Sequence, residues 1–61
     1  MMRELNECIA RKAFASLILD YEWSDMVSCR VLFDGYFEGR FHAANRDEAI
    51  AAFKSGSWRD M

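Results

Sequence analysis

The fold is indicated most clearly by residues 27–56, which read VSCRVLFDGYFEGRFHAANRDEAIAAFKSG. Apolar and polar residues alternate from Val27 to Ala43 around the turn dipeptide Asp34-Gly35, a pattern typical of a β-hairpin. From Asn45 to Gly56 the chain has a capping-box pair, with Glu48 three positions after the cap residue, and a closing glycine. This stretch therefore predicts two antiparallel strands followed by a helix.

The register of the hairpin follows from keeping apolar residues on one face. A tight two-residue turn would place Val31 opposite Glu38, which mixes apolar and charged side chains. Pairing Phe33 with Phe37 across a three-residue loop places Val31 opposite Gly39 and keeps the inner face apolar. We therefore predict the looser turn. Gly39 then marks either a close approach of another element or a β-bulge.

Residues 3–21 are mostly good helix formers, and apolar side chains recur at intervals of four, at Leu5, Ile9, Ala13, Leu17 and Tyr21. This spacing predicts an amphipathic helix. Ile18 and Leu19 lie off that stripe, so we interpret them as part of a surface that contacts a partner. A strand over Ser16–Trp23 is the alternative, because a short apolar run does not distinguish the two structures.

These elements predict a single α+β domain over residues 1–61, with the order helix, β-hairpin, helix. The bounds are about 3–21 for the first helix, about 26–33 and 37–43 for the strands and about 46–55 for the second helix. A short tail, 56–61, completes the chain. Both helices are expected on one face of the antiparallel sheet. Because an isolated two-stranded sheet is marginal and has open edges, we also predict that a homodimer extends it.

Composition supports a small folded protein. The chain has 61 residues, of which 52% are hydrophobic and nine are aromatic, and its formal net charge is −2. No apolar run reaches the roughly 20 residues of a membrane span, and the N-terminus does not resemble a secretory signal. The two cysteines, Cys8 and Cys29, form no CxxC pair and are predicted to be buried thiols. We expect a soluble, cytoplasmic protein.

No residue pattern indicates a catalytic or metal site. The chain has one histidine, His42, and its two cysteines lack the spacing of a zinc site. Cys29 and His42 also fall on opposite faces of the predicted hairpin. The carboxylate pair Asp47 and Glu48 is explained by its place in the first turn of a helix. We therefore predict a non-enzymatic protein without a cofactor or a metal.

In size and make-up the chain resembles the small accessory proteins of phages and mobile elements that inhibit a host enzyme or defence complex, including anti-CRISPR proteins and polymerase inhibitors. The surplus of apolar residues predicts a protein-binding module of this inhibitor or regulator kind. The predicted contact residues are Ile18, Leu19, Arg30, Leu32, Tyr36, Arg40, His42 and Trp58.

Two alternatives remain at this point. Trp58 either folds back on the end of the second helix or is an exposed anchor for the partner. The chain is alternatively a small nucleic-acid-binding regulator that uses Arg30, Arg40 and Arg46, since basic side chains next to an aromatic ring can bind a nucleic-acid strand.

Overall fold

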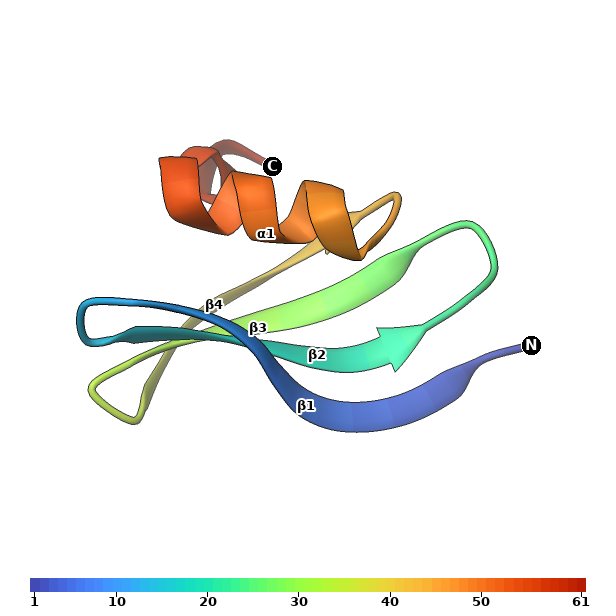
Figure 1. Ribbon diagram of the computed structural model, residues 1–61, viewed down its shortest axis with the longest axis horizontal. Coiled ribbons are helices and arrows are strands. Elements are labelled where there is room, and N and C mark those ends of the chain that lie inside the picture. Colours follow the sequence, from blue (N-terminus) through green and yellow to red (C-terminus); the bar gives the residue numbers. More distant parts are fainter.

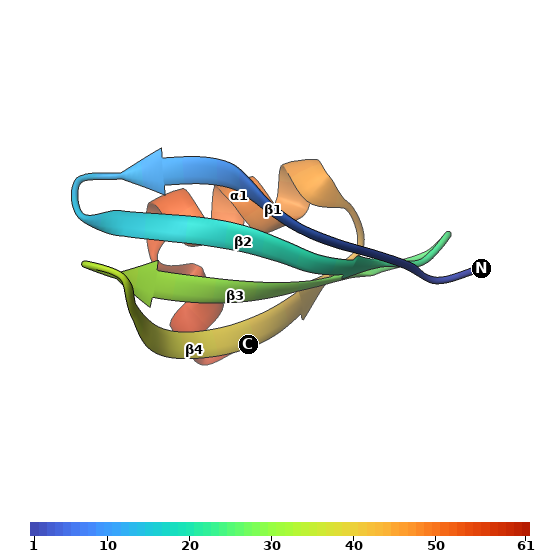
Figure 2. The same ribbon diagram turned by 90° about the horizontal axis from the view of Figure 1, so that it is seen from below.

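A computed structural model describes all residues, 1–61. It has one four-stranded antiparallel sheet with the strands in chain order, followed by an α-helix and a short 3₁₀ helix (Figure 1). The elements are β1 (Arg3–Lys12), β2 (Ala15–Glu22), β3 (Val27–Phe33), β4 (Tyr36–Ala43), α1 (Arg46–Ser55) and η1 (Ser57–Asp60). The helices lie on one face of the sheet, and the other face is uncovered (Figures 1 and 2).

The predicted helix–hairpin–helix order is wrong, because residues 3–21 form the strands β1 and β2 instead of a helix. The interval of four is the reason. Residues four apart share a face in a strand as well as in a helix, since four is a multiple of the strand period of two. Leu17 and Leu19, which are both fully buried, show the strand period directly. The alternative strand over Ser16–Trp23 is confirmed as β2.

The turn between β1 and β2 has no sequence signal. It contains Ala13 and Phe14, and Ala13 adopts a left-handed conformation with φ of 54°. Only glycine, and sometimes Asn or Asp, adopts this conformation readily, and for other residues it costs roughly 1–2 kcal/mol. Pairing of the long strands β1 and β2 therefore imposes this turn, although Ala13 by itself disfavours the left-handed conformation.

In the β3–β4 hairpin the predicted pairs are confirmed, with Val31 opposite Gly39, and likewise Cys29 opposite Phe41 and Val27 opposite Ala43. The predicted three-residue turn is wrong. Asp34 and Gly35 form a tight turn with φ of 52° and 84°, as in a type I′ turn, and Phe33 pairs with Tyr36. Glu38 is the extra residue of a β-bulge, which reconciles the tight turn with the apolar register.

The predicted capping of α1 is confirmed. The backbone N–H of Glu48 donates to Asn45 Oδ1 at 2.9 Å, and Glu48 Oε2 accepts from the backbone of Ala44 at 3.4 Å. At the other end Gly56 has φ of 84°, and its N–H donates to the Phe53 carbonyl. Both ends of the helix therefore have their free backbone groups partly satisfied.

The core lies between the sheet and the two helices. We call this side of the sheet the covered face; its buried residues are Leu17, Leu19, Val27, Cys29, Val31, Phe41 and Ala43 from the sheet and Ala49, Ala52, Phe53 and Trp58 from the helices. Of the two alternatives for Gly39, the close approach is observed, since a Cβ built there would lie 2.9 Å from Trp58 Cζ3, and the bulge falls at the neighbouring Glu38. Gly39 therefore makes room for the indole ring.

Candidate interaction surface

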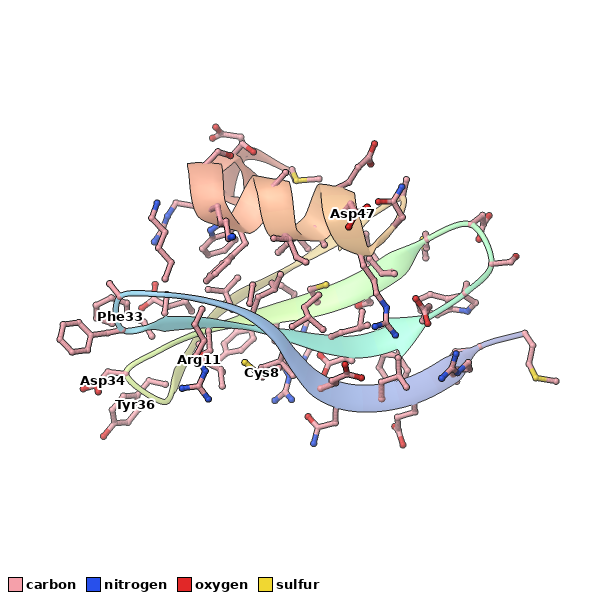
Figure 3. The ribbon with its side chains drawn as sticks, in the orientation of Figure 1. Cys8, Arg11, Phe33, Asp34, Tyr36 and Asp47 are labelled. Carbon is pink, nitrogen blue, oxygen red and sulfur yellow. The ribbon has the colours of Figure 1, made fainter.

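The face of the sheet opposite the helices, which we call the open face, consists of three cross-strand rows. The residues on this face are identified from β3, where Ser28, Arg30 and Leu32 alternate with core residues and therefore point to the opposite side of the sheet. Strand pairing then gives the rows, each with one residue from each strand: Arg11–Ser16–Leu32–Phe37, Cys8–Ile18–Arg30–Arg40 and Glu4–Tyr21–Ser28–His42. Cys8 and Arg11 accordingly lie on the side away from α1 (Figure 3).

Two arginines stand directly opposite each other at the centre of this face. Arg30 on β3 pairs with Arg40 on β4, an arrangement in which like charges destabilise a sheet. The charge of Arg30 is neutralised by Asp20, whose Oδ1 accepts a hydrogen bond from Arg30 Nε at 2.9 Å. Arg30 Nη2 also donates to Asn6 Oδ1 at 2.6 Å. Arg40 forms no ion pair and lies over the Phe37 ring, 5.6 Å from its centroid. Arg40 is therefore available to a partner.

A second feature is a group of four exposed aromatic rings at one end of the sheet, which we call the aromatic tip: Phe14, Phe33, Tyr36 and Phe37. The two hairpin turns meet there, and the Asp34 N–H donates to the Phe14 carbonyl at 2.9 Å. Phe14 and Phe33 pack edge to face with centroids 6.3 Å apart. Phe33, Asp34 and Tyr36 project at this end, opposite the N-terminus (Figures 1 and 3). Phe37 belongs to both surfaces.

The structure brings five predicted contact residues together on the open face: Ile18, Arg30, Leu32, Arg40 and His42. Tyr36 lies beyond the rows at the tip, because the bulge at Glu38 places Phe37, and not Tyr36, opposite Leu32. Leu19 and Trp58 lie in the core, with 0% and 8% of their surface exposed. Because both side chains are buried, the prediction that they contact a partner is wrong. Trp58 is not the exposed anchor of the second alternative: its ring packs on Gly39 and Phe41 of β4.

The three arginines of the nucleic-acid hypothesis do not form one surface. Arg46 begins α1 on the opposite side of the sheet from Arg30 and Arg40, and it donates from Nε and Nη2 to the Glu22 carboxylate at 3.0 and 3.3 Å. Glu7 is a weaker partner at 3.8 Å. These hydrogen bonds lower the pKa of Glu22 and raise the pKa of Arg46. Arg46 thus ties the helix to β1 and β2.

The cysteines also separate between the two faces. Cys29 is fully buried on the covered face, as predicted, and burial raises the pKa of its thiol to about 11, with a smaller contribution from Asp20. The prediction that Cys8 is buried is wrong, because its thiol is exposed on the open face. The reason is that residues 3–12 form an edge strand instead of a helix packed on the sheet.

Sequence reasoning missed Arg11, Phe14, Phe33 and Phe37 as surface residues. The absence of a turn signal at Ala13 hid the connection that exposes Phe14, and the bulge reversed the expected side of Phe37. A usable signal was present for Phe33, which ends a strand immediately before the strong turn dipeptide Asp34-Gly35. A residue next to a turn lies close to the surface, because connecting segments run over the surface of a protein, and Phe33 is 49% exposed.

The structure has no surface pocket, no cluster of three metal-ligating side chains and no helix long and apolar enough to cross a membrane. Cys29 and His42 lie on opposite faces, as predicted from the hairpin register. Comparisons of the chain with protein-family models, curated proteins and solved structures gave no match. The candidate surface is therefore argued from its geometry alone.

Proposed function

We propose that this chain is a non-enzymatic protein-binding module that uses the open face to bind an acidic patch on a larger protein, and that it acts as an inhibitor or regulator. The observation that carries the proposal is the middle of that face, where the apolar Ile18 and Leu32 flank Arg30. Arg40 lies on the other side of Arg30, and its charge has no partner within the chain. Interface centres commonly combine apolar contacts with arginine.

The aliphatic centre of the open face favours a protein over a nucleic acid. A single-stranded nucleic acid stacks its bases on exposed rings. On the two central strands, however, the open face presents Ile18 and Leu32, and its one ring there, Tyr21, is only partly exposed and packs against Trp23. The phosphate backbone would also meet Asp20, which already neutralises Arg30. A protein surface offers both carboxylates for Arg40 and apolar groups for the aliphatic residues.

Charge distribution supports an acidic partner. The chain has a formal net charge of −2, but the two rows nearest the aromatic tip carry Arg11, Arg30 and Arg40, with Asp20 as the acidic neighbour. The open face is therefore more positive than the molecule as a whole, and such complementarity speeds encounter with a negative surface. The exposed thiol of Cys8 supports a reducing compartment, the cytoplasm.

The test is affinity capture from a nuclease-treated lysate of the organism that carries the gene, or of its host, with matched baits. Wild-type chain and Arg59→Glu are expected to retain the same protein, because Arg59 lies in η1 on the helix side of the molecule. Arg40→Glu carries the same charge change on the open face and is expected to reduce capture by about tenfold or more. The isolated partner then gives the affinity of each variant directly.

Two results would contradict the proposal. The first is a set of captured proteins that is the same for wild type and Arg40→Glu. The second is capture that is seen only when the nuclease treatment is omitted and that falls steeply with salt, since that salt dependence is the mark of phosphate contacts. The second result would instead support nucleic-acid binding by the open face.

A further inference from the structure

We propose that the aromatic tip is the contact through which two copies of this chain associate. This interface differs from the open-face site, because Phe14, Phe33 and Tyr36 lie outside the three rows. Phe37 is the one ring that the two surfaces share, and the open-face residues Arg11 and Arg40 border the tip. The tip stands out because every exposed large hydrophobic residue of the chain is found there, apart from methionines at the two chain ends.

The area of the tip suits a weak dimer. The exposed fractions are 73% for Phe14, 49% for Phe33, 76% for Tyr36 and 58% for Phe37. At about 200 Å² for a whole aromatic side chain, the four rings expose roughly 500 Å². A typical stable interface buries about 800 Å² on each partner, and weak ones bury less. The rings supply more than half of that area, and the charged residues around them supply the edge of the contact.

The charged residues around the rings favour a second copy of the chain over a partner whose surface carries charges of one sign only. The charged residues that border the rings are Arg11, Asp34, Glu38 and Arg40, and they take part in none of the four ion pairs of the chain. A two-fold interface brings the same patch against itself, so a patch with both signs can be complementary to itself. Two arginines of one copy can then meet the carboxylates of the other.

The same residues disfavour other occupants. Asp34 lies at the apex of the turn between Phe33 and Tyr36, so insertion of the rings into a lipid surface would carry a carboxylate with them. Pairing of strand edges is also disfavoured. β1 has two register shifts and β4 has the bulge at Glu38, and such irregularities protect edges from adding a further strand.

Sedimentation equilibrium from about 10 µM to about 1 mM tests the proposal. The wild-type chain is expected to show a monomer–dimer equilibrium in the upper part of this range. Tyr36→Ser and Phe14→Ser are each expected to weaken the dimer by about tenfold or more, as for central aromatic residues of an interface. Met2→Ser is the control, because Met2 is 49% exposed at the opposite end of the molecule (Figure 1).

Thermal unfolding of each variant shows whether it remains folded, and both tip positions are exposed enough for that to be expected. A chain that stays monomeric at about 1 mM would overturn the proposal, as would a dimer that Tyr36→Ser and Phe14→Ser leave unchanged. Binding of wild-type chain, but not Tyr36→Ser, to phosphatidylcholine–phosphatidylserine vesicles would assign the tip to a membrane instead. Arg40 borders both surfaces, but Phe14 and Tyr36 lie outside the open-face rows, so Tyr36→Ser and Phe14→Ser should leave capture unchanged and the two proposals can fail separately.

Discussion

The two faces of the sheet use the same four strands for different purposes. On the covered face, alternate residues such as Leu17 and Val31 pack against α1 and η1 and are almost completely buried. Their neighbours on the open face, such as Ile18 and Arg30, are only partly buried and include a pair of opposed arginines. Folding free energy therefore comes mainly from one face, which leaves the other free to vary in chemistry.

This division explains how so small a chain can carry an unfavourable surface. Total stability for 61 residues is expected to be roughly 3–9 kcal/mol. The aligned charges of Arg30 and Arg40 are tolerated because Asp20 and Asn6 hold Arg30, and because the apolar core lies on the far side of the sheet. Four experiments test whether the two faces differ in this way.

The largest contrast is expected between adjacent residues on β2. Leu17→Ala removes a fully buried side chain from the covered face and should lower the free energy of unfolding by about 2–5 kcal/mol. Ile18→Ala, on the open face, should cost less than about 1 kcal/mol because the side chain is only partly buried. Urea unfolding followed by tryptophan fluorescence measures both. Equal losses would show that the open face is covered in solution.

Gly39→Ala tests the packing of η1 on the covered face. The added methyl group would lie 2.9 Å from the Trp58 ring, which is itself held against Phe41 with centroids 6.0 Å apart. We expect a loss of about 1–3 kcal/mol in urea unfolding. In a Trp58→Phe background, where the smaller ring leaves room, the same substitution should cost less. An equal cost in both backgrounds would contradict this account of Gly39.

Asp20→Asn tests the charge balance of the open face. The substitution keeps the shape of the side chain but removes the charge that offsets Arg30, so we expect a loss of about 1 kcal/mol at low salt. Adding Arg40→Gln should recover part of that loss by removing the opposed positive charge. Asp25→Asn, in the exposed β2–β3 turn, is the control and should have little effect. The absence of any recovery would mean that the two arginines do not interact.

The smallest expected effect concerns the two thiols. At pH 8, iodoacetamide should modify the exposed Cys8 and leave the buried Cys29 unmodified until the chain unfolds. Cys29 titrates near its ordinary value of 9.0 when unfolded and near 11 when folded. Because the folded state keeps the proton, stability should fall by roughly 0.8 kcal/mol between pH 8 and 9.5.

Cys29→Ala is the control for this pH effect, since it removes the thiol and leaves the other groups that titrate at high pH. The variant should lose less stability between the two pH values than the wild type. Modification of Cys29 in the folded chain at the same rate as Cys8 would show that the covered face opens readily.

The C-terminal half of the fold was predictable because its signals are local. The capping pair of Asn45 and Glu48 and the stop at Gly56 act within one helix, and the alternation around Asp34-Gly35 acts within one hairpin. The bulge at Glu38 was harder to predict. The bulge moves Phe37 from the covered face to the open face and leaves the alternation further along β4 unchanged. The sequence is therefore compatible with both a three-residue turn and a tight turn with a bulge.

Most of the candidate surface was less predictable than the core. Arg30, Leu32, Arg40 and His42 follow from strand alternation, whereas Ile18 was assigned from its place off the stripe of a predicted helix; the structure places all five on the open face. The aromatic tip does not follow, because Phe14 and Phe33 are distant in sequence and meet only when two hairpins pair side by side. Leu19 was misassigned because a helical interpretation put it on the wrong side of its element.

Local sequence signals were enough for the inner register of β3 and β4 and for both ends of α1, since each depends on residues within one hairpin or one helix. At Gly39 they left a close approach and a bulge open, and the packing of Trp58 from the far end of the chain filled the space. The tertiary structure alone decided that residues 3–22 form strands, because their spacing fits both a helix and a strand. Pairing with β3 and burial of Leu17 and Leu19 under α1 made the strand more stable. That choice created the open face and the aromatic tip.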